Sequence, residues 1–177
     1  MIEAAIGVPR KALPEVDIQP GELYLTRRPM ILATILGSCI GITFRSARLG
    51  AAAMCHGVLP RCPKSRPPDS SPAEGYRYVD FCIRHLARQF DALGAGRDEI
   101  EVKVFGGADV ISAPGTNGGR PTVGALNCQA ATEVLALEGF TVLARDIGGV
   151  QGRKIHFHTG TGEVLLRRLA VSNGGNL

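Results

Sequence analysis

Short apolar runs alternate with glycine, proline and polar residues through the first third of the chain. The runs cover residues 21–26, 30–36, 40–44 and 49–54. Apolar segments of about 4–8 residues that end at turn-forming residues are typical of packed β-strands. We therefore predict four strands here, joined by tight turns.

A longer hydrophobic period marks two helices. The first is predicted over residues 76–93, where apolar residues recur every three or four positions: Val79, Ile83, Leu86, Phe90 and Leu93. This spacing places them on one helix face, and Gly94 stands where a helix commonly ends. A second helix is predicted over 123–138, capped by Thr122 and stopped by Gly139. Its shared face comprises Leu126, Ala130, Val134 and Leu137.

The remaining regular segments are strands. Residues 100–105 and 140–146 have strand patterns, and residues 155–157 and 164–169 predict a hairpin turned by Thr-Gly-Thr-Gly at 159–162. The element order is thus several strands, a helix, a strand, a helix and further strands. That order fits neither regular βαβ alternation nor an all-β sandwich. It predicts an α+β fold with a strand-rich core and two main helices packed on it.

The ends of the chain and two internal segments lack such patterns. Residues 60–72 hold five prolines, which exclude helix and central strand, and residues 109–121 form a loop containing glycine and proline. Residues 1–20 are interpreted as an extended N-terminal arm and residues 171–177 as a flexible tail. With 177 residues in total, residues 21–170 are expected to form a single domain.

Charge and cysteine content narrow the class of protein. The net charge of +4 comes from Lys and Arg residues that are spread along the chain, not interleaved with aromatics. This pattern argues against a nucleic-acid partner. The five cysteines are an odd number without a CxxC motif, which argues against a disulfide framework. Neither a secretory signal nor an apolar run of about 18 residues is visible, so we expect a reduced cytoplasmic protein without membrane insertion.

The candidate nucleophile lies in Gly37-Ser38-Cys39, between two apolar strands. Gly37 has backbone freedom, and the small Ser38 leaves room for a substrate amide, so both are candidate substrate-binding residues. Backbone N–H groups near Cys39 can receive a developing oxyanion. The alternative is that Cys39 only fills space, as free cysteines commonly do.

His56 and Thr34 are the candidate partners of this cysteine. His56 follows 17 positions after Cys39, where a strand meets the proline-rich loop. Imidazole is the usual base for a catalytic thiol, and such a neighbour would let Cys39 alkylate below about pH 8.5. Thr34 stands five residues before Cys39, which on a regular strand places the two side chains on opposite faces unless a bend intervenes. The alternatives are a histidine at a strand end and an ordinary strand threonine.

The sequence offers two possible metal sites, and neither is favoured. His156 and His158 share a strand face, but no third ligand is evident near them. Cys55 and Cys62 could join His56 at a zinc ion, but their spacing matches no structural zinc motif. The glycine pairs at 106–107 and 148–149 fit no phosphate-binding motif. We expect no metal and no cofactor.

Seven motifs, in order over about residues 20–170, resemble the chemoreceptor glutamine deamidases of bacterial chemotaxis, the CheD family. They are Leu36–Cys39, Gly50–Pro60 with its His-x-x-Leu-Pro, Lys103–Ala108, Val123-Gly124 with Asn127, Asp146–Gly149, Gly152–Lys154 and Thr161–Leu165. The resemblance implies a mixed β-sheet or sandwich core flanked by helices, similar to toxin-type glutamine deamidases. It also implies a catalytic Cys39 and His56 and a supporting Thr34, for which Ala33 is the alternative register.

The resemblance further implies a function and partners. The implied reaction is conversion of glutamine to glutamate on methyl-accepting chemotaxis receptors through a cysteine thioester, a route that would also hydrolyse glutamate methyl esters. A CheC-type phosphatase is an implied partner. Cys55 and Gly57, on either side of His56, depart from the common family residues. The alternative function is therefore a non-catalytic docking module that binds receptors or the phosphatase.

Overall fold

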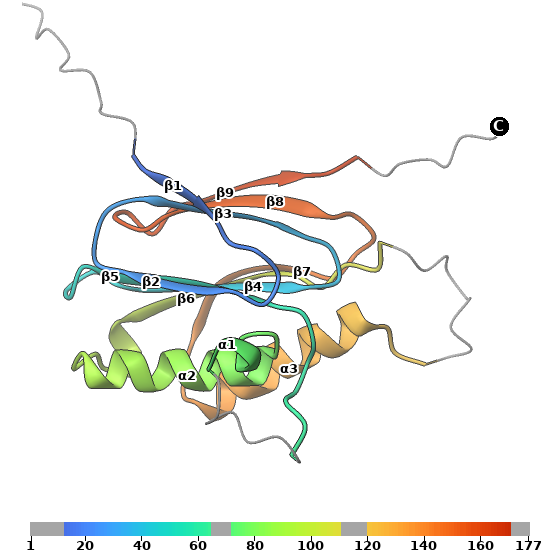
Figure 1. The fold of residues 1–177 in the computed structure, drawn as a ribbon, viewed down its shortest axis with the longest axis horizontal. Coiled ribbons are helices and arrows are strands. Elements are labelled where there is room, and N and C mark those ends of the chain that lie inside the picture. The colour runs from blue at the N-terminus through green and yellow to red at the C-terminus, as the bar shows by residue number, and fades with distance from the viewer. Residues whose placement is uncertain (1–12, 65–71, 111–119, 171–177) are drawn as a thin grey trace, which may run out of the picture.

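The computed structural model describes residues 13–64, 72–110 and 120–170, which form three layers. A four-stranded sheet lies over a five-stranded sheet, and the helices cover the outer face of the five-stranded sheet (Figure 1). This arrangement confirms the predicted α+β class with a mixed sandwich core and flanking helices. No helix in the described ranges combines the length and apolarity needed to cross a bilayer.

The four-stranded sheet has the order β1-β3-β8-β9. Its strands are β1 (Glu15–Asp17), β3 (Ile31–Leu36), β8 (Arg153–His158) and β9 (Val164–Arg168). β1 runs parallel to β3, and the other pairs are antiparallel. The β8–β9 hairpin confirms the turn predicted from the Thr-Gly-Thr-Gly segment. β1 was not among the predicted strands.

The five-stranded sheet has the order β2-β5-β4-β6-β7. Its strands are β2 (Leu23–Thr26), β5 (Ala51–Gly57), β4 (Ile40–Ser46), β6 (Ile100–Gly106) and β7 (Val142–Ile147). Only β6 and β7 pair in parallel among these described strands. The helical segments are α1 (Pro72–Gly75), α2 (Val79–Ala92), α3 (Val123–Leu137) and the 3₁₀ turn η2 (Arg97–Glu99).

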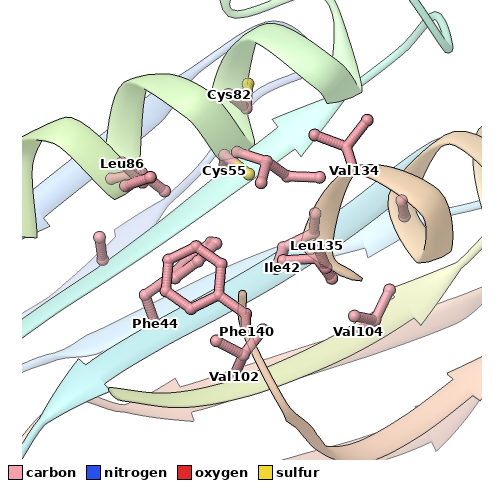
Figure 2. Packing of buried hydrophobic residues seen from close by; sticks show 14 of the residues in the cluster. Ile42, Phe44, Cys55, Cys82, Leu86, Val102, Val104, Val134, Leu135 and Phe140 are labelled. Atoms are coloured by element: carbon pink, nitrogen blue, oxygen red, sulfur yellow. The ribbon is translucent and has the colours of Figure 1, made fainter. Parts of the chain in front are cut away.

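Two hydrophobic clusters fill the spaces between the layers. The helix-side cluster, between α2, α3 and the five-stranded sheet, is shown in Figure 2 and includes Ile42, Phe44, Cys55, Cys82, Leu86, Val102, Val104, Val134, Leu135 and Phe140. The inter-sheet cluster comprises Ile18, Met30, Leu32, Leu36, Ala52, Met54, Phe105, Ile155 and Phe157. Every residue of β5 is buried, because successive side chains of this strand enter the two clusters in turn.

The apolar pattern predicted the buried face of α2 better than that of α3. The four apolar residues expected to face the core from α2 within its bounds are buried, as predicted. In α3 the Thr122 cap is confirmed, since its side chain accepts a 3.1 Å hydrogen bond from the Ala125 N–H. The predicted face of α3 was wrong at its edges, because Leu137 is 76% exposed and Leu126 is only partly buried. The observed buried face centres on Gly124, Asn127, Ala130, Ala131, Val134 and Leu135.

The predicted loops and terminal segments are only partly described. Residues 60–64 have no helix or strand, and residues 109, 110, 120 and 121 are likewise irregular. The central parts of both predicted loops lie outside the described residues, as do residues 1–12 of the N-terminal arm and the tail at 171–177. The described end of the arm contacts the core through Ile18, which is 3% exposed.

Candidate active site

Cys39 lies in the turn that carries the chain from one sheet to the other. β3 ends at Leu36 in the four-stranded sheet, and β4 begins at Ile40 in the five-stranded sheet. Two backbone hydrogen bonds of 2.8 Å fix the turn, from the Gly107 N–H to the Cys39 carbonyl and from the Ala108 N–H to the Gly37 carbonyl. The turn therefore rests on the chain that leaves β6.

Glycine is required beneath this turn. Gly106 has a φ of +109°, and a Cβ there would lie 2.1 Å from the Cys39 carbonyl oxygen. An L-residue would meet both a strained backbone angle and a direct clash. The glycine pair at 106–107, which fits no phosphate-binding motif, thus allows the backbone at Cys39 to approach β6.

His56 lies on the strand next to β4 and faces the same side as Cys39. His56 pairs directly with Gly41, which stands two residues after Cys39. Cross-strand partners share a face, and alternate residues of a strand share a face. The half-buried Cys39 packs against the inter-sheet cluster, in agreement with this assignment. Diagonal neighbours of this kind have Cα atoms about 7–8 Å apart, within reach of side chains such as these.

A hydrogen-bond chain across the two sheets fixes the orientation of His56. The Thr34 hydroxyl donates to the Ile18 carbonyl at 2.7 Å and lies 2.8 Å from Nδ1 of His56. Because the hydroxyl proton is committed to Ile18, the Thr34 oxygen accepts from an Nδ1–H. His56 is then the tautomer whose Nε2 carries a lone pair. That buried Nε2 has no hydrogen-bond partner among the described residues.

The structure brings Thr34 to His56 although its spacing from Cys39 suggested the wrong face. Thr34 points into the space between the sheets with Leu32 and Leu36, its alternate neighbours on β3. The alternation cannot be continued to Cys39, because the chain changes sheet in between. The turn at residues 37–39 is the bend that allows Thr34 and Cys39 to face the same space.

The resting protonation of the pair follows from burial. Burial lowers the pKa of His56 from its ordinary value, and the Ile18 carbonyl and Glu22 carboxylate offset part of this effect. Burial raises the pKa of the Cys39 thiol, and the backbone N–H of Cys39 itself offsets part of that shift. The resting pair is therefore a neutral thiol and a neutral imidazole. The raised pKa of the Cys39 thiol is opposite in direction to the easier alkylation, below about pH 8.5, that a neighbouring imidazole was expected to cause.

Asn127 is a site residue to which the sequence pattern assigned no role. It lies on α3, is fully buried, and donates from Nδ2 to the Ser38 carbonyl at 2.9 Å and to the Val58 carbonyl at 3.0 Å. One amide therefore joins the cysteine turn to the segment that follows His56. The sequence signal was the family resemblance, which includes Asn127 together with Val123-Gly124.

Arg153 is a second site residue to which the sequence pattern assigned no role. Its side chain binds backbone carbonyls next to the cysteine turn. Its side chain is fully buried, pairs with the Asp146 carboxylate at 2.9 Å and donates to the Gly106 carbonyl at 3.0 Å. It also donates to the backbone carbonyls of Asp146 and Gly148. In the sequence, Arg153 stood beside Lys154 as one of several basic pairs, and nothing local distinguished it from a surface residue.

The residues flanking His56 have structural explanations. Cys55 belongs to the helix-side cluster, so its side chain points away from the inter-sheet space. At Gly57 a Cβ would lie 2.7 Å from Cγ2 of Val79 and 3.2 Å from its Cα. The glycine is therefore needed for the first turn of α2 to pack on β5.

The other candidates are placed as follows. Gly37 and Ser38 are half-buried beside Cys39. His156 and His158 lie half-buried on the outer face of β8, and His156 Nε2 is 3.8 Å from a Glu15 oxygen. Within residues 13–64, 72–110 and 120–170, no three His, Cys, Asp or Glu side chains are grouped so as to hold a metal ion.

Comparisons with known proteins agree on one family. Residues 59–168 match the family described as CheD chemotactic sensory transduction. A probable chemoreceptor glutamine deamidase CheD 2 of Geobacter sulfurreducens is 40% identical over 157 residues, 89% of this chain and 91% of the relative. A probable chemoreceptor glutamine deamidase CheD of Oleidesulfovibrio alaskensis is 38% identical over 89% of this chain and 74% of the relative.

Another relative and a solved structure are also similar to this chain. The protein of the same name from Maridesulfovibrio salexigens is 35% identical over 87% of this chain and 91% of the relative. The solved structure of hypothetical protein YfiH of Bacillus licheniformis aligns with a TM-score of 0.44 and 10% identity over 70% of this chain and 49% of that chain.

Proposed function

Since this chain belongs to the CheD family, we propose that it is a chemoreceptor glutamine deamidase in which Cys39 is the nucleophile, His56 the base and Thr34 the residue that orients the base. The observation that carries the proposal is the hydrogen-bond chain from Ile18 through Thr34 to Nδ1 of His56. It leaves a lone pair on the buried Nε2, on the face that Cys39 also occupies.

The reaction begins from the neutral pair. His56 Nε2 takes the proton of the Cys39 thiol as the sulfur attacks the carboxamide carbon of a glutamine side chain. The C–S bond forms and the carbonyl oxygen becomes an oxyanion, held by backbone N–H groups near Cys39. The imidazolium then gives its proton to the leaving nitrogen, and ammonia departs as the tetrahedral intermediate collapses to a thioester.

Hydrolysis returns the enzyme to its starting state. His56 removes a proton from water, the hydroxide attacks the thioester carbon, and the C–S bond breaks. Glutamate is released and the thiol regains its proton. Thr34 supports each step because its oxygen accepts from Nδ1–H, which favours the tautomer with a free Nε2 and stabilises the imidazolium. The lowered pKa of His56 keeps this base neutral in the resting enzyme.

The substrate and partners are part of the same proposal. The relatives are named chemoreceptor glutamine deamidases, which supports glutamines of methyl-accepting chemotaxis receptors as the substrates. The same thioester route would hydrolyse glutamate methyl esters, because the acyl-enzyme is identical. A CheC-type phosphatase is a proposed binding partner, and we place the protein in the cytoplasm, where its cysteines stay reduced.

The test is mass spectrometry of a receptor cytoplasmic fragment incubated with wild-type protein, Cys39→Ala or His56→Ala. Wild type should convert defined glutamines to glutamates, and both variants should abolish conversion while keeping the native circular dichroism spectrum. Cys128→Ala is the matched control, since Cys128 is also a half-buried cysteine but lies on α3. Full activity of Cys39→Ala would refute the mechanism. A wild-type protein that binds the fragment without converting it would instead be the docking module.

A further inference from the structure

Three successive backbone carbonyls of the cysteine turn are held by different groups. The carbonyls of Gly37 and Cys39 accept from the backbone N–H groups of Ala108 and Gly107. The carbonyl between them, that of Ser38, accepts from the side chain of Asn127 at 2.9 Å. The orientation of the peptide that joins Ser38 to Cys39 thus depends on a side chain, whereas the carbonyls on either side are held by backbone.

We propose that Asn127 is a positioning residue that directs the backbone N–H of Cys39 toward the oxyanion of the acylation step, an inference that rests on the function proposed above. In a trans peptide the C=O and the N–H point in opposite directions, and the described chain contains no cis peptide. Since Asn127 draws the Ser38 carbonyl toward α3, the N–H of Cys39 points away from α3. An N–H on the nucleophile itself lies close to where the oxyanion forms.

The orientation of the Asn127 side-chain amide is itself fixed by its two contacts. The side-chain amide of Asn127 can have only one orientation, because its flipped form would set Oδ1 against two carbonyl oxygens. Asn127 therefore acts as a donor to both segments.

The second bond of Asn127 extends its effect to the base. Val58, whose carbonyl accepts at 3.0 Å, stands two residues after His56. The helix that carries Asn127 is held close to the turn, since a Cβ at Gly124 would lie 2.7 Å from the Gly107 carbonyl oxygen. α3 thus sets the position of the oxyanion donor relative to the nucleophile and to the strand of the base.

The experiment compares a reaction that forms an oxyanion with one that does not. Asn127→Leu keeps the branching and the number of heavy atoms of the side chain without a donor, and Asn127→Ala is the second variant if the first does not fold. Deamidation of a receptor fragment should lose about 10- to 100-fold in kcat with little change in KM, because one oxyanion donor is misdirected. Alkylation of Cys39 by iodoacetamide, a displacement without an oxyanion, should stay within about threefold of wild type.

Thr122→Ala is the matched control. It removes the cap of α3 without touching the cysteine turn, so it measures the effect of a weakened helix alone. Equal losses of deamidation and alkylation in the Asn127 variants would overturn the inference, as would the same kcat loss in Thr122→Ala or undiminished deamidation in Asn127→Leu. A wild-type protein that converts no glutamine would instead overturn the proposed function on which the inference rests.

Discussion

At the scale of single residues, the hydroxyl of Thr34 is the group that selects the tautomer of His56. Thr34→Val keeps the shape of the side chain and removes this acceptor. The Ile18 carbonyl, which lies 3.4 Å from Nδ1 of His56 in the wild type, remains as an acceptor for the Nδ1–H, so the base is weakened but not lost. We expect kcat/KM for deamidation to fall by about 10- to 100-fold, less than in His56→Ala.

Thr43→Val is the control for this prediction. Thr43 is also a buried threonine, paired with Met54 of the inter-sheet cluster. It should retain near wild-type kcat/KM in the same assay. An equal loss in both variants would show that removing any buried hydroxyl disturbs the site, and Thr34 would then lose its specific role.

What the sequence could predict about these residues depended on local context. Cys39 stood out because glycine and serine precede it at a strand joint, and His56 because it ends an apolar run. Asn127 and Arg153 act through contacts with segments remote in sequence. Their partners are backbone carbonyls. Because every residue has one, the sequence does not indicate which carbonyls these side chains bind. Both residues lie in motifs of the family resemblance, but only the fold shows which groups they hold.

At the scale of elements, the contact between β5 and α2 depends on Gly57. In Gly57→Ala the new methyl group would lie 2.7 Å from Cγ2 of Val79 and 3.3 Å from its backbone nitrogen. Overpacking of this kind costs about 1–3 kcal/mol of unfolding free energy, which urea denaturation should detect. In Gly160→Ala the added carbon would lie 3.4 Å from Pro29, an ordinary contact, so stability should change by no more than about 0.5 kcal/mol. Equal stability of both variants would contradict the packing explanation.

The elements were predicted better than their arrangement. The helix α2 followed from a regular apolar period, whereas α3 has a face rich in small residues and was assigned a rotated face. The strands β3 and β4 follow each other with a tight turn, a pattern that favours a hairpin, yet they belong to different sheets. β3 pairs with β8, and β4 pairs with β5. The residues of a strand do not by themselves indicate which other strand it will pair with.

At the scale of the whole molecule, the site depends on two sheets stacked face to face. The thiol comes from the joint between the sheets, the base from one sheet and the orienting hydroxyl from the other. The four-stranded sheet closes the space in which His56 is buried. The stacking of the two sheets is therefore also what keeps the imidazole neutral. We therefore expect protonation of His56 to reduce the stability of the sandwich.

This link predicts that the folded state loses stability as the pH falls below about 6.5, the ordinary histidine value. Burial lowers the pKa of His56 and, more exposed on α2, that of His85. The unfolded chain therefore binds more protons than the folded chain between about pH 6.5 and the lowered pKa values, and the free energy of unfolding decreases through that window. Carboxylates remain largely ionised above about pH 5, so histidines control this range. The urea midpoint should decrease between about pH 7.5 and 5.5 in wild type and decrease less in His56→Gln. An identical decrease in both proteins would show that protonation of His56 is not what opens the sandwich.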